Sequence, residues 1–244
     1  MSHSNEADDP RRRLLIQALS AGMFAAGIPG ANAQVANIFG SRPARLPPSQ
    51  SIYRISGSAT VNDKPATLQT KIVPGDTVKT AKDSELVMVV NTNAMILRGN
   101  SNVIIEAEKK DTSLVISGLR MLTGALLSVS RNTPMRVRSP TATVGIRGTG
   151  FYMEAEEDQT YFCTCYGATE VASSTDPESK ENIVAKQHDR PVYIVKDGAK
   201  GKNIRNAPFI NHTDLELALI ETLVGRTPPF IFPNESYTAP RRNY

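Results

Sequence analysis

Hydrophobic residues from Ser51 onward fall into short runs, which turn-forming residues separate at intervals of roughly ten residues. This spacing is typical of all-β proteins, and it predicts many short strands in a sandwich, a barrel or a solenoid. The expected strands comprise residues 53–60, 68–72, 77–78, 85–90, 94–97, 102–107, 114–116, 124–129, 135–139, 160–166, 183–186 and 192–196.

Two of these runs indicate how the predicted strands are buried. Residues 85–90 read ELVMVV, a nearly continuous apolar run that is typical of a strand covered on both faces. Residues 135–139 alternate strictly, so one face of that strand is apolar and the other is basic. Residues 114–116 and 124–129 are expected to pair with each other across Gly118.

Three glycines stand close together around Arg147, in the order Gly145-x-x-Gly148-x-Gly150. This order differs from the dinucleotide-binding fingerprint, and no crossover helix follows it. A tight connection between strands, in which only glycine fits, is the structural interpretation. The functional alternative is a nest of backbone amides that accepts an anion, with Arg147 as the counter-charge.

One helix is predicted beyond the N-terminal region, and it begins at a capping box formed by residues 213–216. Gly225 and the two prolines that follow it are signals for the end of the helix. The helix is expected to dock on the β region rather than on a partner, through a narrow apolar stripe of Leu215, Leu219, Ile220 and Leu223.

The first 33 residues have the order of a secretory signal peptide. Three arginines at positions 11–13 precede a mildly apolar stretch, and the small-x-small sequence Ala31-Asn32-Ala33 follows it. The arginines and the two leucines after them resemble a twin-arginine export signal, although the ordinary secretory route stays open. The pattern predicts cleavage after Ala33 and a periplasmic location. No other segment is long and apolar enough to cross a membrane, so no span is expected in the mature chain.

The order of several short motifs carries a family resemblance. These motifs are Pro74-Gly75-Asp76-Thr77-Val78, Ser84 with its apolar strand, Leu97-Arg98 with Ser101, the run Gly124 to Val129 and the run Ser139 to Phe151. In this order they resemble the FecR-type domain of periplasmic envelope-signalling regulators. The resemblance implies an exported all-β module that senses or relays a state of the envelope through protein contacts, without enzymatic activity. The anti-sigma segment of those regulators is not expected here.

The expected domain organisation follows from these patterns and from the resemblance. It consists of a twin-arginine-like signal peptide (1–33), a linker (34–50), a FecR-like β domain (51–172), a strand and helix extension that packs on the β domain (173–226) and a tail rich in proline and arginine (227–244).

The net charge of +4 at pH 7 comes from basic residues that occur singly among apolar or small residues. These basic residues are Arg98, Arg120, Arg131, Arg136, Arg138 and Arg147. We expect them on solvated strand faces, and their scattering does not predict a nucleic-acid interface. The expected partner is instead an envelope protein or a small ligand.

Cys163 and Cys165 are the two cysteines of the chain, and a strand would place both thiols on one face. Their Cα atoms would lie about 6.5 Å apart, at the upper edge of disulfide geometry. A labile disulfide or a shared metal is therefore easier than a structural disulfide, which leaves a redox-thiol protein as one alternative.

The mature chain would keep two histidines, His188 and His212, beside the two cysteines. Together the four residues could form a tetrahedral Cys2His2 site for zinc or another transition metal. Their spacing matches no known zinc finger or knuckle. The structural alternative is that the cysteines are small hydrophobic core residues and the histidines are hydrogen-bonded or solvated.

The remaining polar clusters do not predict catalysis. Glu154, Glu156, Glu157 and Asp158 are interpreted as a charged, solvated hairpin tip. The chain has no G-x-S-x-G elbow, and the adjacent pair His188-Asp189 does not make a catalytic dyad. Because no catalytic motif is complete, we expect no enzymatic activity.

Overall fold

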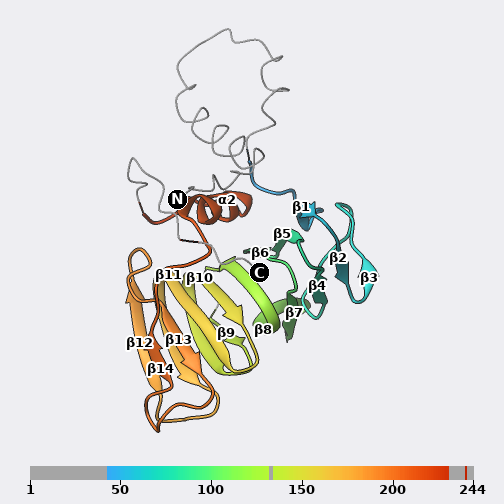
Figure 1. Ribbon diagram of the computed structural model, residues 1–244. Coiled ribbons are helices and arrows are strands. Elements are labelled where there is room, and N and C mark those ends of the chain that lie inside the picture. The colour runs from blue at the N-terminus through green and yellow to red at the C-terminus, as the bar shows by residue number, and fades with distance from the viewer. Residues whose placement is uncertain (1–42, 132–133, 231–239, 241–244) are drawn as a thin grey trace, which may run out of the picture. The chain divides into compact units, whose positions relative to one another are not determined.

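The computed structural model divides the chain into two compact units, Met1–Ala44 and Arg45–Tyr244, and the strands and helix below belong to the second. The structure describes residues 43–131, 134–230 and 240 (Figure 1).

The predicted signal peptide, residues 1–33, lies outside the described residues, as do most of the predicted linker and most of the predicted tail. Among the residues that are described, no helix has the length and apolar character needed to span a membrane.

The described residues form fourteen strands and one helix near the C-terminus, which confirms the predicted all-β class with a C-terminal helix. The elements are β1 (Ile52–Ser56), β2 (Ala59–Val61), β3 (Lys64–Pro65), β4 (Thr77–Thr80), β5 (Glu85–Val90), β6 (Asn93–Leu97), β7 (Asn102–Lys110), β8 (Ser113–Val129), β9 (Met135–Arg138), β10 (Ala142–Ala155), β11 (Gln159–Ser173), β12 (Lys180–Ala185), β13 (Val192–Val195), β14 (Ile204–Asn206) and α2 (Asp214–Leu223).

Three strands are much longer than the sequence pattern predicted, and they divide the sheet into two halves. β8, β10 and β11 each change neighbours part-way along their length. For example, β11 pairs with β13 through its first residues and with β12 through its last ones. The first half-sheet contains β12, β9, β7, β4, β2 and β3, and the second contains β14, β13, β6, β5 and β1; the long strands run through both.

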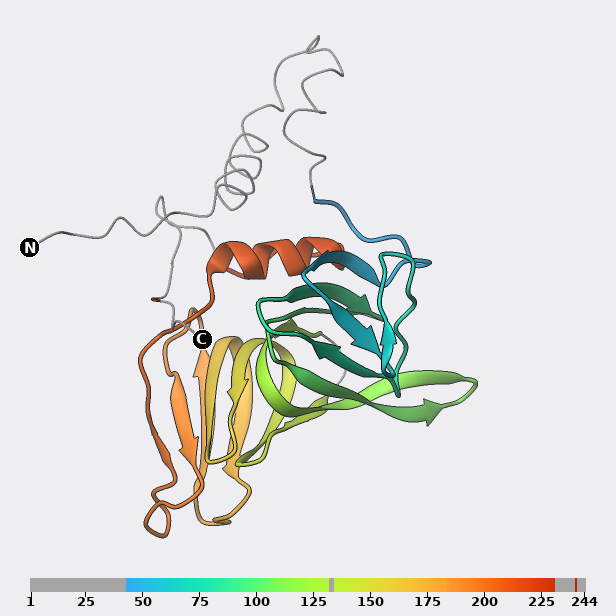
Figure 2. The ribbon, with the colours of Figure 1, turned by 45° about the vertical axis from the view of Figure 1, so that its right-hand side comes forward.

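Two separate hydrophobic clusters cover the faces of the second half-sheet. The first core receives Leu86 and Met88 of β5, whereas the second core receives Val87 from the opposite face of the same strand. All three side chains are fully buried, which confirms that this strand is covered on both faces. Figure 2 shows α2 beside these strands, where its apolar residues complete the second core.

Two strand predictions are wrong. Residues 68–72 form no strand, because Thr67 and Thr70 close a turn through hydrogen bonds between their backbones and side chains. Residues 114–116 and 124–129 do not pair with each other, because both belong to the continuous strand β8. A positive φ of 88° at Gly124 bends this strand instead of ending it.

The glycine segment also differs from its prediction as a connection between strands. It lies inside β10, where the pairing with β11 shifts register between Arg147 and Gly150. Gly148 has a φ of 64° at this bulge, which glycine adopts without strain. A Cβ atom at Gly150 would lie 2.4 Å from the Tyr166 ring, so only glycine fits there.

The helix α2 confirms the predicted capping box. Thr213 accepts a hydrogen bond from the Glu216 amide, and the Glu216 side chain accepts one from the Thr213 amide. The apolar stripe is wider than predicted: Leu217 and Ala218 are buried, while Leu215 is only half-buried. The helix contacts β6 and β8, so it docks in cis.

Arg98 lies between the helix and the sheet, and its predicted place on a solvated strand face is wrong. Its side chain is only 13% exposed and forms ion pairs with Glu85 and, at 2.7 Å, with Glu216 of α2. Burial alone would lower the pKa of Arg98, but the two carboxylates raise it above its ordinary value. This guanidinium therefore neutralises the carboxylates of β5 and α2.

We predict that Arg98→Met lowers the free energy of unfolding by about 3–5 kcal/mol, because it leaves Glu216 without its ion-pair partner and Glu85 with Arg54 alone. Urea denaturation followed by circular dichroism would measure the loss. The matched control is Arg120→Met, since Arg120 is 51% exposed in its ion pair with Glu106 and should cost no more than about 1 kcal/mol. Equal losses in the two variants would contradict this account of Arg98.

Candidate metal centre

Strand β11 carries both cysteines into the second core. Cys163 and Cys165 are fully buried on the same face, and Cys163 stands opposite Tyr152 of β10. Thr164 lies between them and bonds Thr169 through the side-chain oxygens at 2.8 Å. The predicted strand and the shared face of the two thiols are both confirmed.

The two histidines come from segments on either side of β13. His188 lies in the turn between β12 and β13, where its backbone amide donates to the Cys165 carbonyl at 3.0 Å. His188 has a φ of 53°, a conformation that is uncommon for a residue with a Cβ atom. Strained backbone like that of His188 is frequent at functional sites. His212 immediately precedes Thr213, the N-cap of α2.

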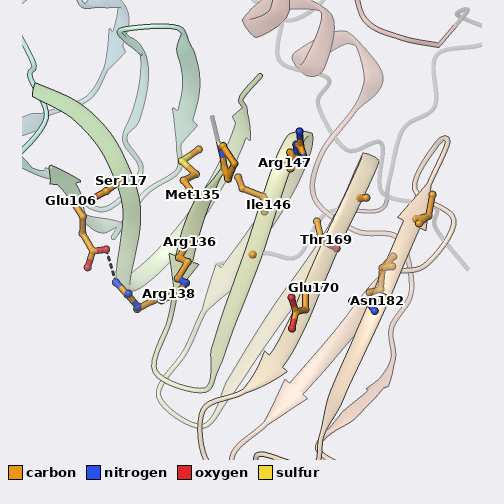
Figure 3. A pocket seen from close by; sticks show the side chains of 15 residues that line it. Glu106, Ser117, Met135, Arg136, Arg138, Ile146, Arg147, Thr169, Glu170 and Asn182 are labelled. Carbon is orange, nitrogen blue, oxygen red and sulfur yellow. Dashed lines mark hydrogen bonds and ion pairs between the residues drawn. The ribbon is translucent and has the colours of Figure 1, made fainter. Parts of the chain in front are cut away.

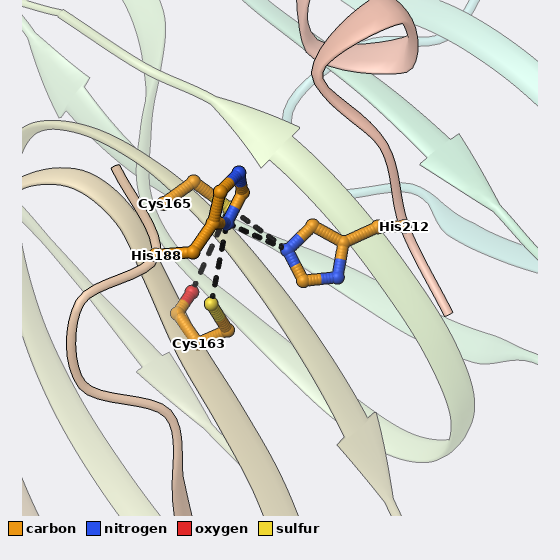
Figure 4. A group of neighbouring side chains, drawn as sticks. All are labelled: Cys163, Cys165, His188 and His212. Atoms are coloured by element: carbon orange, nitrogen blue, oxygen red, sulfur yellow. Dashed lines mark hydrogen bonds between the residues drawn. The ribbon is translucent and has the colours of Figure 1, made fainter. Parts of the chain in front are cut away.

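The structure brings all four predicted residues together (Figure 4). The side-chain donor atoms lie within 4.8 Å of one another. Cys163 Sγ lies 3.5 Å from His188 Nδ1, and Cys165 Sγ lies 3.4 Å from His212 Nε2. A tetrahedral zinc ion separates its sulfur and nitrogen ligands by about 3.3–3.8 Å. These two distances therefore already match those between ligands of a bound ion.

The outer nitrogen of each imidazole is held by a hydrogen-bond acceptor. His188 Nε2 donates to Asp214 Oδ1 at 2.9 Å, and His212 Nδ1 donates to the Ile210 carbonyl at 2.7 Å. Each bond places the proton on the outer nitrogen and leaves the inner nitrogen with a lone pair. Carboxylate and carbonyl partners of this kind orient histidine ligands in metal proteins.

The two inner nitrogens, His188 Nδ1 and His212 Nε2, lie only 3.1 Å apart. With both outer nitrogens protonated, two lone pairs would face each other at this distance. A cation between them relieves that repulsion, and so does an additional proton on one ring. The geometry consequently favours positive charge at the centre of the four side chains.

The pKa shifts of His188, Cys163 and Cys165 also favour positive charge at this centre. Burial opposes it, but hydrogen bonds to Asp214 and Cys163 raise the pKa of His188 to about 9. For Cys163, burial alone would raise the pKa, yet its hydrogen bond with Cys165 and the nearby imidazoles hold that pKa well below the ordinary value. Burial and the neighbouring Cys163 raise the pKa of Cys165. The site thus favours a thiolate and a positive charge side by side.

Aromatic rings pack tightly around the imidazoles. Phe209 lies 4.3 Å from the His188 ring and 4.6 Å from the His212 ring, measured between centroids. Tyr152 stacks on His212 at 4.5 Å and donates a hydrogen bond to Glu154 at 2.8 Å. Glu154 also accepts from Asn211 and is buried, so its predicted place in a solvated acidic tip is wrong.

All four donors are buried, and together they supply a full tetrahedral set. A closed set of this kind is typical of structural zinc sites, whereas catalytic zinc keeps one position for water or substrate. The arrangement can hold an ion and link three chain segments, but it offers no open position for a reacting molecule.

Sequence reasoning found the four donors but not the residues that orient them. Asp214 was visible as part of the capping box, yet its carboxylate accepts from His188 and from Gln187 Nε2, at 2.6 Å. No sequence pattern places Phe209 against both histidines. These contacts arise only when the turn after β12 meets the segment that leads into α2.

Residues 76–169 match the family model described as FecR protein. The chain carries a FecR domain. The matched residues begin just before β4 and end within β11, so they include both cysteines but neither histidine. The FecR resemblance read from the motif order is thereby confirmed.

Solved structures of similar proteins include two crystal structures, at 1.65 and 2.50 Å resolution, of a candidate anti-sigma factor from Parabacteroides distasonis ATCC 8503. They are 16% and 17% identical to this chain, with a TM-score of 0.42 in each case. Each alignment covers 54% of this chain and 58% of the other, so this chain spans little more than half of those proteins. No curated protein matches the sequence.

We predict that Asp214→Asn weakens zinc affinity about 10–100-fold, because the variant loses the carboxylate that orients His188. Competition with a chromophoric chelator would measure the affinity. The control is Asp197→Asn, which removes an exposed carboxylate outside the cluster. Equal zinc affinity in Asp214→Asn and wild type would contradict the orienting role of Asp214.

Proposed function

We propose that this protein is an exported, non-enzymatic FecR-type module that acts in binding or signalling in the cell envelope and holds one transition-metal ion. The proposed ligands are Cys163, Cys165, His188 and His212. Zinc is the first candidate, because it favours four-coordinate tetrahedral sites of thiolate and imidazole.

One observation carries the metal proposal. The inner nitrogens of His188 and His212 approach to 3.1 Å while Asp214 and the Ile210 carbonyl hold the outer ones. Core histidines that serve only in packing do not need to point two lone pairs at each other and at two thiols. Four such donors around one point are the arrangement that a tetrahedral ion requires.

Other observations support the envelope role. The FecR match over residues 76–169 favours a signalling type of role, in which the domain works through contacts with other molecules. The signal-like pattern of residues 1–33 supports export. The closed metal centre supports a non-enzymatic role, since its ion would serve to join chain segments.

A redox-thiol protein is the second candidate function, and one observation favours it. Cys163 Sγ lies 3.5 Å from His188 Nδ1, and the lowered pKa of Cys163 beside the raised pKa of His188, about 9, favours a thiolate paired with an imidazolium. Such thiolates react with oxidants more readily than ordinary thiols. In this case Cys165 would be the second thiol of a labile disulfide. The metal and redox candidates use the same four residues and differ in what neutralises the thiolate.

Elemental analysis of untagged protein tests the metal proposal. We expect about one metal ion per chain in the wild type and a clear loss in Cys163→Ser, because three remaining donors bind less tightly than four. The matched control is Thr164→Ser, which keeps the hydroxyl that bonds Thr169 between the two ligands. Thiol titration of the unfolded protein would accompany the analysis, with two free thiols expected after metal release.

Two outcomes would contradict this proposal. Absence of stoichiometric metal from both the wild type and Cys163→Ser would exclude a metal centre. A metal-free wild type without titratable thiols would in addition identify the disulfide and favour the redox candidate.

A further inference from the structure

A groove of about 750 Å³ lies on the first half-sheet, over strands β9 to β12 (Figure 3). None of the four metal donors lines it. Its middle is one row of lining residues that stand opposite each other on adjacent strands: Arg136, Gly145, Glu170 and Asn182. Gly118 of β8 pairs with Arg136 at the end of this row but does not line the groove. Grooves of this volume are large enough for a small ligand or a few residues of peptide.

Gly145 in this row is not explained by the fold. It lacks a positive φ, and an added Cβ would meet nothing closer than the Cβ of Glu170, at 3.8 Å. By contrast, a Cβ at Gly118 would lie 2.6 Å from the Arg136 carbonyl oxygen. A glycine inside a strand weakens it and often marks the close approach of another molecule. The missing side chain at Gly145 keeps the groove open.

Two guanidinium groups that have no partner among the described residues line the groove beside Gly145. Arg136 and Arg147 are exposed and line the groove, and neither guanidinium forms an ion pair or a hydrogen bond with another described residue. The third arginine of the groove, Arg138, is bound to Glu106 at 2.5 Å. The unpaired positive charges favour an anionic occupant.

We infer that this groove binds an acidic, extended segment of a partner polypeptide. Carboxylates of the segment would pair with Arg136 and Arg147, while its amides could donate to Glu170. A polymer that carries a negative charge at every residue fits less well, because one of its charges would face Glu170 and be repelled. Val184, 77% exposed on β12, lines the groove and supplies an apolar contact.

The inference rests on the binding role proposed above and names the chemistry of its partner. It does not involve the metal centre, because the groove and the centre share no residue. Peptide binding and metal content are therefore separate measurements, and either can fail without the other.

Fluorescence anisotropy with a labelled octapeptide of alternating glutamate and leucine tests the groove. We expect wild-type binding that weakens as salt rises, and at least a tenfold loss in the double variant Arg136→Ser/Arg147→Ser. Gly145→Val should lose binding at least tenfold while its Tm is unchanged or raised, because valine suits a half-buried strand position. Lys82→Ser, an exposed cation outside the groove, should bind like the wild type.

Several results would overturn the inference. One is that the wild type does not bind the acidic peptide. Another is that Gly145→Val or the double arginine variant binds it with the affinity of the wild type. A third is that the wild type binds an octapeptide of alternating lysine and leucine equally well. Complete displacement of the acidic peptide by inorganic phosphate or by phosphatidylglycerol vesicles would also overturn it, because it would indicate a general anion site or a lipid surface.

Discussion

The close approach of the His188 and His212 imidazoles is the constraint on which the C-terminal part of the fold depends. The residues around it tie the first turn of α2 to the sheet: Asp214 holds His188, and Glu216 bonds Arg98 two residues further on. Positive charge between the imidazoles permits this packing, and its loss would place two lone pairs 3.1 Å apart. An ion at this point would therefore stabilise the docking of α2 as well as the four ligands.

The FecR domain and the segments after it contribute different parts of the candidate centre. Cys163 and Cys165 lie within the residues that match the family, whereas His188 and His212 lie beyond them. The groove on the first half-sheet likewise joins β9 and β10 of the matched region to β12. Both candidate sites thus need residues 180–212 in addition to the matched region, and neither would be complete with the FecR motifs alone.

Local patterns predicted the fold class and the four donors, whereas long-range contacts decided the rest. The capping box of α2 and the two-sided burial of β5 follow from neighbouring residues, so the sequence reveals them. The continuity of β8 through Gly118 and Gly124 depends on which strands it meets. The burial of Arg98 and Glu154 depends on segments more than fifty residues away, which no periodicity records.

X-ray absorption spectroscopy at the zinc edge of the purified, untagged protein tests the metal centre most directly. A bound zinc ion should show two sulfur ligands at about 2.3 Å and two nitrogen ligands at about 2.0–2.1 Å. Replacement of Cys163 by serine should remove one sulfur from this shell. A shell made only of nitrogen and oxygen ligands, unchanged in the Cys163→Ser variant, would contradict the assignment of the metal to this cluster.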